Sequence, residues 1–398
     1  MRMAITFGSN QVISHGFGLF LFAAMVPLMQ QDITISHWYL AAIGAATQLA
    51  YLGGALLLGL FGHKLNSARL LLWCGVMTSV LLFAMAFIQS PLAMLIVLVL
   101  MAASAAVSWG GIVELVSCFG QPQYRATSLS TAASGTAWGY SINGLIILAI
   151  VPLAGWQGGW VAAAIMGLLT IGATAFMLRR LCCAVSQVEI EAPPSMPAKQ
   201  LFRTIFKERI AFVCSLMTFL VGFATMPFST WLNTYLAELS LPAELGGYTW
   251  SLIGLSGMAA GFLVGKLADS KGSSTALLFT TTGFAIGIIA FLLDPATFVL
   301  LAGFSYGLMY FPIWGVLAGW LSKHYGSKAT MQINGIGMVT FGLGGALGNM
   351  IAGGLYEASG SLADLFALIA FISVLLTLLA LHIYRLERQG SRPVIGAV

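Results

Sequence analysis

Residues 91–119 read PLAMLIVLVLMAASAAVSWGGIVELVSCF. A run of about 20 apolar residues crosses the roughly 30 Å hydrocarbon core of a bilayer as a helix, so this stretch predicts a transmembrane span. Its one charged residue, Glu114, is the only acid inside any of the long apolar runs of the chain. An ionised carboxylate at membrane depth costs roughly 2.5–3.5 kcal/mol, so such a residue usually faces a protein-lined or wet cavity and takes part in function.

The rest of the chain has the same apolar character. Hydrophobic residues make up 59% of the 398 residues and charged residues 7%, and the mean hydropathy is +0.95. These values are far from those of soluble domains. We therefore predict an all-α polytopic membrane protein with twelve transmembrane helices, at residues 5–30, 38–62, 70–89, 91–119, 127–152, 157–181, 210–236, 246–268, 274–293, 296–321, 328–357 and 362–384.

The charged residues predict the orientation of these spans. With twelve spans, all 17 Lys and Arg residues fall on the side of the two termini. The loops on the other side carry only acids, namely Asp32, Glu238, Glu244, Asp294, Glu357 and Asp364. Since cytoplasmic loops of membrane proteins are enriched in Lys and Arg, we expect both termini in the cytoplasm. An odd number of spans would scatter the basic residues over both sides.

Two halves of the chain repeat each other. The loops that begin at Gly59 and Gly265 lie 206 positions apart, and the similar segments at Arg125 and Lys328 lie 203 positions apart. Such a duplication is typical of transporters that work by alternating access. We predict two pseudo-symmetric six-helix halves at residues 1–181 and 210–384, a cytoplasmic linker at 182–209 and a cytoplasmic tail at 385–398.

The end of the linker has an amphipathic pattern. Leu201, Phe202, Ile205 and Phe206 fall on one helical face, and Lys199, Arg203 and Lys207 fall elsewhere. This pattern is typical of a helix on an anionic inner leaflet, although a plain spacer without a regulatory role has the same composition.

The segment Gly265-x-Leu267-Ala268-Asp269-x-x-Gly272 resembles the loop signature of the major facilitator superfamily (MFS), as do the twelve spans, the repeat and the basic linker. In the first-half copy of this loop, His63 stands at the Asp position. The resemblance implies a gating loop at Gly265, Asp269 and Gly272, and a central cavity lined by spans one, four, seven and ten. The segment AAMVPLMQQDITIS also resembles bacterial sugar- or drug-efflux members, which implies a bacterial inner membrane.

Two residues in the implied cavity spans can carry protons. Glu114 and His15 are the candidates for proton coupling, at heights in the membrane that differ by about 6 Å for ideal helices. Each has a structural alternative. A buried histidine often only joins two helices by hydrogen bonds, and Glu114 can pair with Lys64 or Arg69 of the neighbouring loop.

A larger set of residues can contact a substrate. The candidates are aromatic or amide side chains within predicted spans: Gln11, Trp109, Asn143, Phe223, Tyr306, Tyr310, Trp314 and Asn334. Aromatic walls bind apolar or cationic groups, but the same residues can also pack or join helices. No Lys or Arg lies in the interior of a predicted span. This argues against small anions as substrates, because their carriers usually supply a fixed cation.

We therefore predict a proton-coupled secondary transporter that moves a small neutral, aromatic or cationic organic substrate. The alternatives are an uncoupled facilitator of a neutral solute and a transport-inactive membrane sensor or scaffold that retains the fold. No nucleophile elbow, zinc helix or phosphate loop is present, so we expect no enzyme activity, metal site or cofactor. The expected partners are the substrate, protons and the lipid bilayer, without nucleic acid, and we expect a monomer.

Overall fold

The computed structural model describes residues 2–61, 66–119, 125–184, 197–322, 324–325 and 327–390. These residues form helices joined by short turns. The helices of the first half are α1 (Arg2–Gln11), η1 (Val12–Phe17), α2 (Gly18–Met29), α3 (His37–Phe61), α4 (Ser67–Met85), α5 (Pro91–Phe119), α6 (Arg125–Ala133), α7 (Gly135–Leu145), η4 (Ile146–Ile150) and α8 (Val151–Ala184). Those that follow are α9 (Ala198–Lys207), α10 (Arg209–Glu238), α11 (Ala243–Lys271), α12 (Ser273–Leu293), α13 (Pro295–Tyr310), α14 (Ile313–Ser322), α15 (Ser327–Ser359) and α16 (Ala363–Gly390).

The structure confirms a polytopic helical membrane protein. Eleven helical segments in the described ranges are long and apolar enough to cross a bilayer. One of them, Thr131–Arg180, has 50 residues, about 75 Å of helix and more than twice the hydrocarbon thickness. It reverses at Gly155, where φ is +67°, a conformation that glycine adopts without steric cost. The segment therefore makes two crossings, which brings the number of spans to twelve.

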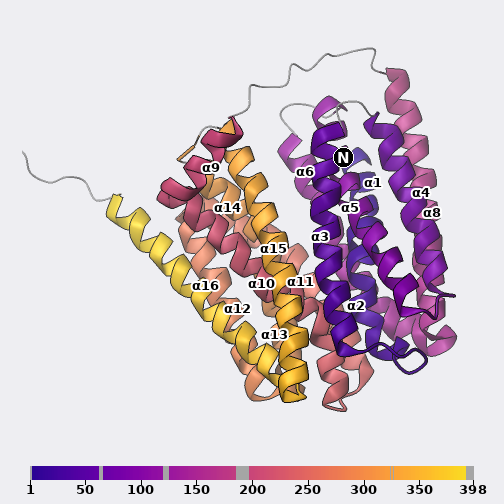
Figure 1. The fold of residues 1–398 in the computed structure, drawn as a ribbon. Coiled ribbons are helices and arrows are strands. Elements are labelled where there is room, and N and C mark those ends of the chain that lie inside the picture. Colours follow the sequence, from indigo (N-terminus) through magenta and orange to yellow (C-terminus); the bar gives the residue numbers. More distant parts are fainter. Residues whose placement is uncertain are drawn as a thin grey trace, which may run out of the picture.

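The two halves form two bundles that stand side by side, with α1–α8 in one and α10–α16 in the other (Figure 1). The N-terminus and α9 lie at the same end of the molecule. We call this end, where α10 begins at Arg209 and α11 ends at Lys271, the basic end. The opposite end, where α10 ends at Glu238 and Asp294 precedes α13, is called the acidic end.

Polar caps begin two of the spans. The side chain of Asn66 accepts a hydrogen bond from the Arg69 backbone N–H (3.0 Å) at the start of α4. Asp294 accepts from the Thr297 N–H (3.3 Å) at the start of α13, where Pro295 stands at the first helical position. Hydrogen bonds from the hydroxyl and backbone of Thr297 lower the pKa of Asp294 below its usual 3.8. Each cap satisfies a donor that the first turn of a helix leaves free.

Two interruptions of the α-helical pattern lie in the middle of the membrane. Span one contains the π-helical turn η1, which holds His15. Span ten breaks between Tyr310 and Ile313, since Pro312 has no backbone N–H to continue the helix. Trp314 therefore lies on a separate helix from Tyr306 and Tyr310, although the three residues recur every four positions in the sequence. Turns of these kinds are frequent at functional sites.

The halves meet along two pairs of helices near the acidic end. On α3 and α15, an added Cβ at Gly353 would lie 2.5 Å from the Ala41 side chain, and one at Gly44 would lie 2.6 Å from Asn349. On α7 and α11, the Ser141 hydroxyl donates to the Ser251 carbonyl (3.1 Å).

Nearer the basic end, several glycines have no close neighbour. Added Cβ atoms at Gly261 and Gly265 of α11 and at Gly335 of α15 would meet no atom within 4 Å. By contrast, Gly344 and Gly348 of α15 pack tightly against α10 of the same half, at Phe219 and Pro227. Only part of the small-residue pattern of α15 therefore serves the contact between the halves.

Gly272 links α11 to α12 with φ +95° and ψ 152°, a region of backbone space that is essentially restricted to glycine. We expect Gly272→Ala to destabilise the protein by about 1–3 kcal/mol, which a lower Tm of the purified protein would reveal. Gly261→Ala is the matched control, because Gly261 is helical and an added Cβ meets no neighbour within 4 Å. An equal loss of Tm in both variants would contradict this explanation.

Candidate functional site

Three hydroxyl groups meet in the middle of the interface between the halves. They belong to Tyr140 of α7, Ser229 of α10 and Tyr306 of α13. The Ser229 and Tyr306 oxygens are 2.8 Å apart, and the Tyr140 oxygen lies 3.3 Å from each of them. All three side chains are buried. We call this group the hydroxyl triangle. It hydrogen-bonds the first half directly to two helices of the second.

Aromatic rings enclose the hydroxyl triangle. Trp250 stacks on Tyr140 at 4.9 Å, and Phe228 stacks on Tyr306 at 5.1 Å. Tyr310 lies 5.1 Å from Tyr306. The structure thus brings Tyr306 and Tyr310, both predicted from the sequence, to the interface of the halves. Tyr140 was missed, although the argument that singled out Tyr306, a tyrosine in mid-span, applies to it equally.

His15 lies beside the interface in a defined hydrogen-bond pattern. The Ser14 hydroxyl donates to the Asn10 carbonyl (2.8 Å), so its oxygen is left to accept from His15 Nδ1 (3.0 Å). The other ring nitrogen, Nε2, then accepts from the Tyr51 hydroxyl (3.2 Å). This network assigns a neutral imidazole with its proton on Nδ1. Tyr51 belongs to α3, the helix that meets α15 of the second half.

Glu114 lies apart from His15, toward the basic end. Its side chain is exposed, and its Oε2 accepts a hydrogen bond from the Ser67 hydroxyl (2.6 Å). Ser67 is the first residue of α4, and the N-terminus of a helix favours a nearby negative charge. Of the two basic partners considered for Glu114, Lys64 lies outside the described residues, and Arg69 comes two residues after the serine that Glu114 contacts.

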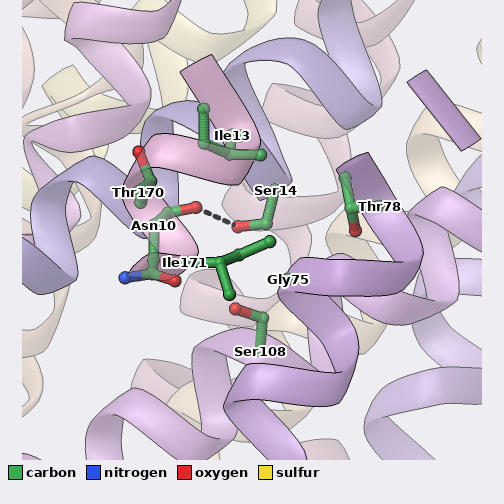
Figure 2. Close-up of a pocket in the computed structure, with 9 residues that line it drawn as sticks. Asn10, Ile13, Ser14, Gly75, Thr78, Ser108, Thr170 and Ile171 are labelled. Carbon is green, nitrogen blue, oxygen red and sulfur yellow. Dashed lines mark hydrogen bonds between the residues drawn. The ribbon is translucent and has the colours of Figure 1, made fainter. Parts of the chain in front are cut away.

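A small polar pocket lies inside the first half (Figure 2). Its polar lining comes from four spans: Asn10, Ser14, Thr78, Ser108 and Thr170. The free volume is about 10 Å³, enough for one water molecule. Ser14 contacts His15, and Ser108 precedes Glu114 by six residues on α5, about 9 Å along the helix axis.

The predicted amides Gln11 and Asn143 are buried, Asn334 is half-buried, and all three are only partly satisfied. Asn143 of α7 donates to the Gly16 carbonyl of η1 (2.8 Å), which holds spans one and five together. Its Oδ1, the Nε2 of Gln11 and the Oδ1 of Asn334 have no hydrogen-bond partner within the described part of the chain. An unsatisfied buried polar atom costs about 1–3 kcal/mol. Each amide can therefore accept a further partner, such as water or a substrate group.

The remaining predicted aromatics take different places. Phe223 of α10 is buried next to Phe219 at 6.3 Å. Trp314 of α14 is half-buried and meets Phe341 edge-on at 5.0 Å. Trp109 packs instead in a separate cluster near the basic end of the first half, against residues such as Phe7, away from the hydroxyl triangle.

The predicted gating loop is described at all three of its positions. Asp269 is exposed on α11, Gly265 is half-buried, and Gly272 has the positive φ given above. The acid that reaches this loop is Glu387 of α16, which accepts from the Ser274 hydroxyl. No local sequence pattern indicates this contact, because 113 residues separate its partners.

A family model described as Major Facilitator Superfamily matches residues 11–330. The chain belongs to the Major Facilitator Superfamily. It is therefore a membrane transporter and not an enzyme, as the sequence predicted.

Two solved structures of the nucleoside transporter NupG share this MFS fold. One, a point mutant, has a TM-score of 0.75 at 14% identity and covers 96% of this chain and 99% of its own. The other has a TM-score of 0.72 at 15% identity, with coverages of 96% and 98%. At such low identity the likeness shows the fold alone. Among curated proteins, none matches this sequence.

Proposed function

We propose that this MFS protein is a proton-coupled secondary transporter of the bacterial inner membrane, which moves a small neutral, aromatic or cationic organic substrate by alternating access. The observation that carries the proposal is the hydroxyl triangle. Tyr140, Ser229 and Tyr306 join the two halves through hydrogen bonds that a rocking motion must break. Such a junction is where substrate binding can be linked to the motion of the halves.

The positive-inside rule places the basic end in the cytoplasm. The halves touch near the acidic end, and several glycines near the basic end have no close neighbour. In this orientation the structure corresponds to a state that opens toward the cytoplasm. A transition to the outward-facing state would separate Ser141 from Ser251 and bring the glycines of α11 and α15 near the basic end toward the first half.

We infer the substrate class from the side chains that the predicted substrate residues present. Tyr306, Tyr310 and Trp314 offer ring faces, and Gln11 and Asn334 offer free amide atoms. A neutral molecule with an aromatic ring and hydroxyl groups fits both features. Nucleosides have this chemistry, and the solved structures compared above belong to a nucleoside transporter, so nucleosides are the first class to test.

Proton coupling is assigned to His15 and Glu114 in different roles. His15 contacts Tyr51 of α3, the helix that meets α15 of the second half, and Ser14, which lines the polar pocket. Exposed Glu114 near the basic end can exchange protons with water. In neutral His15 the free lone pair is on Nε2, which faces the Tyr51 hydroxyl, so His15 takes up its proton on that side. We assign the polar pocket beside Ser14 to an ordered water. A proton on His15 turns Nε2 into a donor and reverses its hydrogen bond with Tyr51 on α3, the helix that meets the second half.

The test is uptake by purified protein in proteoliposomes. Radiolabelled uridine, a neutral sugar and an aromatic amine are supplied with and without an imposed pH gradient. Accumulation of one compound only with the gradient, and its loss on addition of a proton ionophore, is the expected result. Equilibration that ignores the gradient would instead identify a facilitator. A lack of transport of any compound of these classes would favour the sensor or scaffold alternative.

A further inference from the structure

The short helix α9 uses only part of its apolar surface to pack against the protein. Ile205 is buried, and Leu201 is half-buried one turn earlier. Phe202 and Phe206, the next row around the helix, are 55% and 72% exposed. Two large rings on one helix face, one turn apart, thus lie on the surface without cover from the described residues.

A row of cations lies on the other side of these rings. Lys199, Arg203 and Lys207 follow one another at intervals of four residues, and all three side chains are exposed. At 100° per residue, the order around the helix is therefore buried Leu201 and Ile205, then the two phenylalanines, then the three cations. This order matches a helix at the surface of a bilayer, with rings among the lipids and cations at phosphate level.

The position of α9 agrees with such a role. A single residue, Glu208, separates it from Arg209, where the membrane span α10 begins. The helix lies at the basic end of the second half (Figure 1). Ile205 belongs to the core of that half, and the Thr204 hydroxyl donates to Glu208 (3.3 Å). The helix is therefore fixed to the second half at the height of the membrane surface.

We propose that α9 is a binding surface for anionic phospholipids of the leaflet at the basic end. Phe202 and Phe206 insert between the headgroups, and Lys199, Arg203 and Lys207 contact the lipid phosphates. Because α9 continues almost directly into α10, and α10 carries Ser229, lipid binding restrains the second half during its rocking motion. The charge pattern selects anionic over zwitterionic lipids, since each cation near an anionic surface adds to the attraction.

The test compares hydrogen exchange of the full-length protein in nanodiscs of phosphatidylcholine, with and without phosphatidylglycerol. The backbone amides of 198–207 should exchange at least about tenfold more slowly when phosphatidylglycerol is present, given three cations at the surface. High salt should remove this difference in the wild-type protein, because salt screens the attraction between exposed charges.

Variants separate the two parts of the surface. Lys199→Gln/Arg203→Gln/Lys207→Gln should remove the response to phosphatidylglycerol, and Phe202→Ser/Phe206→Ser should weaken it. The matched control, Lys266→Gln/Lys271→Gln/Arg385→Gln, removes three exposed cations elsewhere at the basic end and should keep the response. Equal exchange in both lipids for the wild-type protein would overturn the proposal, as would an equal loss of the response in the control. Slow exchange in both lipids would mean that another part of the chain covers the rings.

Discussion

His15→Gln should abolish the accumulation of substrate that a pH gradient drives, while exchange of substrate across the membrane continues. Glutamine can still donate a hydrogen bond to Ser14 or accept one from Tyr51, but it cannot hold a proton at physiological pH. The variant therefore keeps one of the two contacts of neutral His15 and loses its titration. Proteoliposomes that perform counterflow but no longer respond to the gradient would be the measured outcome.

Glu114→Gln separates the two proposed proton groups. The amide can still accept from Ser67, so the Tm should change little, whereas proton entry should slow and gradient-driven accumulation should fall strongly. Ser67→Ala is the matched control, because it removes the same hydrogen bond and leaves the carboxylate. If both variants lower the Tm alike and leave coupling intact, Glu114 only anchors the start of α4, and the coupling role belongs to another residue.

Tyr306→Phe should weaken substrate binding and shift the balance between the two states of the transporter. The ring stays in its packing, but the hydroxyl that bonds Ser229 and Tyr140 is lost. A buried partner left without its bond costs about 1–3 kcal/mol, which corresponds to roughly fivefold to hundredfold in an equilibrium constant. Binding affinity and the accessibility of a cysteine placed at Gly261 or Gly335 would report the two effects.

The control for this prediction is Tyr235→Phe. Tyr235 is buried and stacks on Phe366 within the second half, so its hydroxyl does not join the two halves. We expect this variant to leave affinity and accessibility near those of the wild-type protein. Tyr140→Phe should resemble Tyr306→Phe, since Tyr140 brings the first half into the same hydroxyl triangle. If all three variants behave alike, the hydroxyl triangle is packing and not a junction between states.

The twelve spans and the family could be predicted from the sequence because membrane insertion depends on local properties. A run of apolar residues must form a helix in lipid to satisfy its own backbone, whatever its neighbours are. The chain reverses at Gly155. This residue lies in the short gap between the fifth and sixth predicted spans, so the observed turn agrees with the predicted boundary. A polar side chain at membrane depth costs free energy unless it has a hydrogen-bond partner. Mid-span residues such as His15 and Tyr306 could therefore also be recognised from the sequence.

The partners themselves depended on packing that no local pattern encodes. Tyr140 and Tyr306 are 166 positions apart, and their hydroxyls meet only because α7 and α13 approach across the halves. The height of Glu114 along its helix was predictable, but its bond to Ser67 depends on how α4 and α5 pack. The small-residue pattern of α15 was equally ambiguous, since Gly344 faces α10 while Gly353 faces α3. The sequence by itself determined which residues must be in the membrane and which of them need a hydrogen-bond partner. Only the tertiary structure decided which partners these residues find. The choice of partner depends on how helices far apart in the chain are rotated and packed against each other.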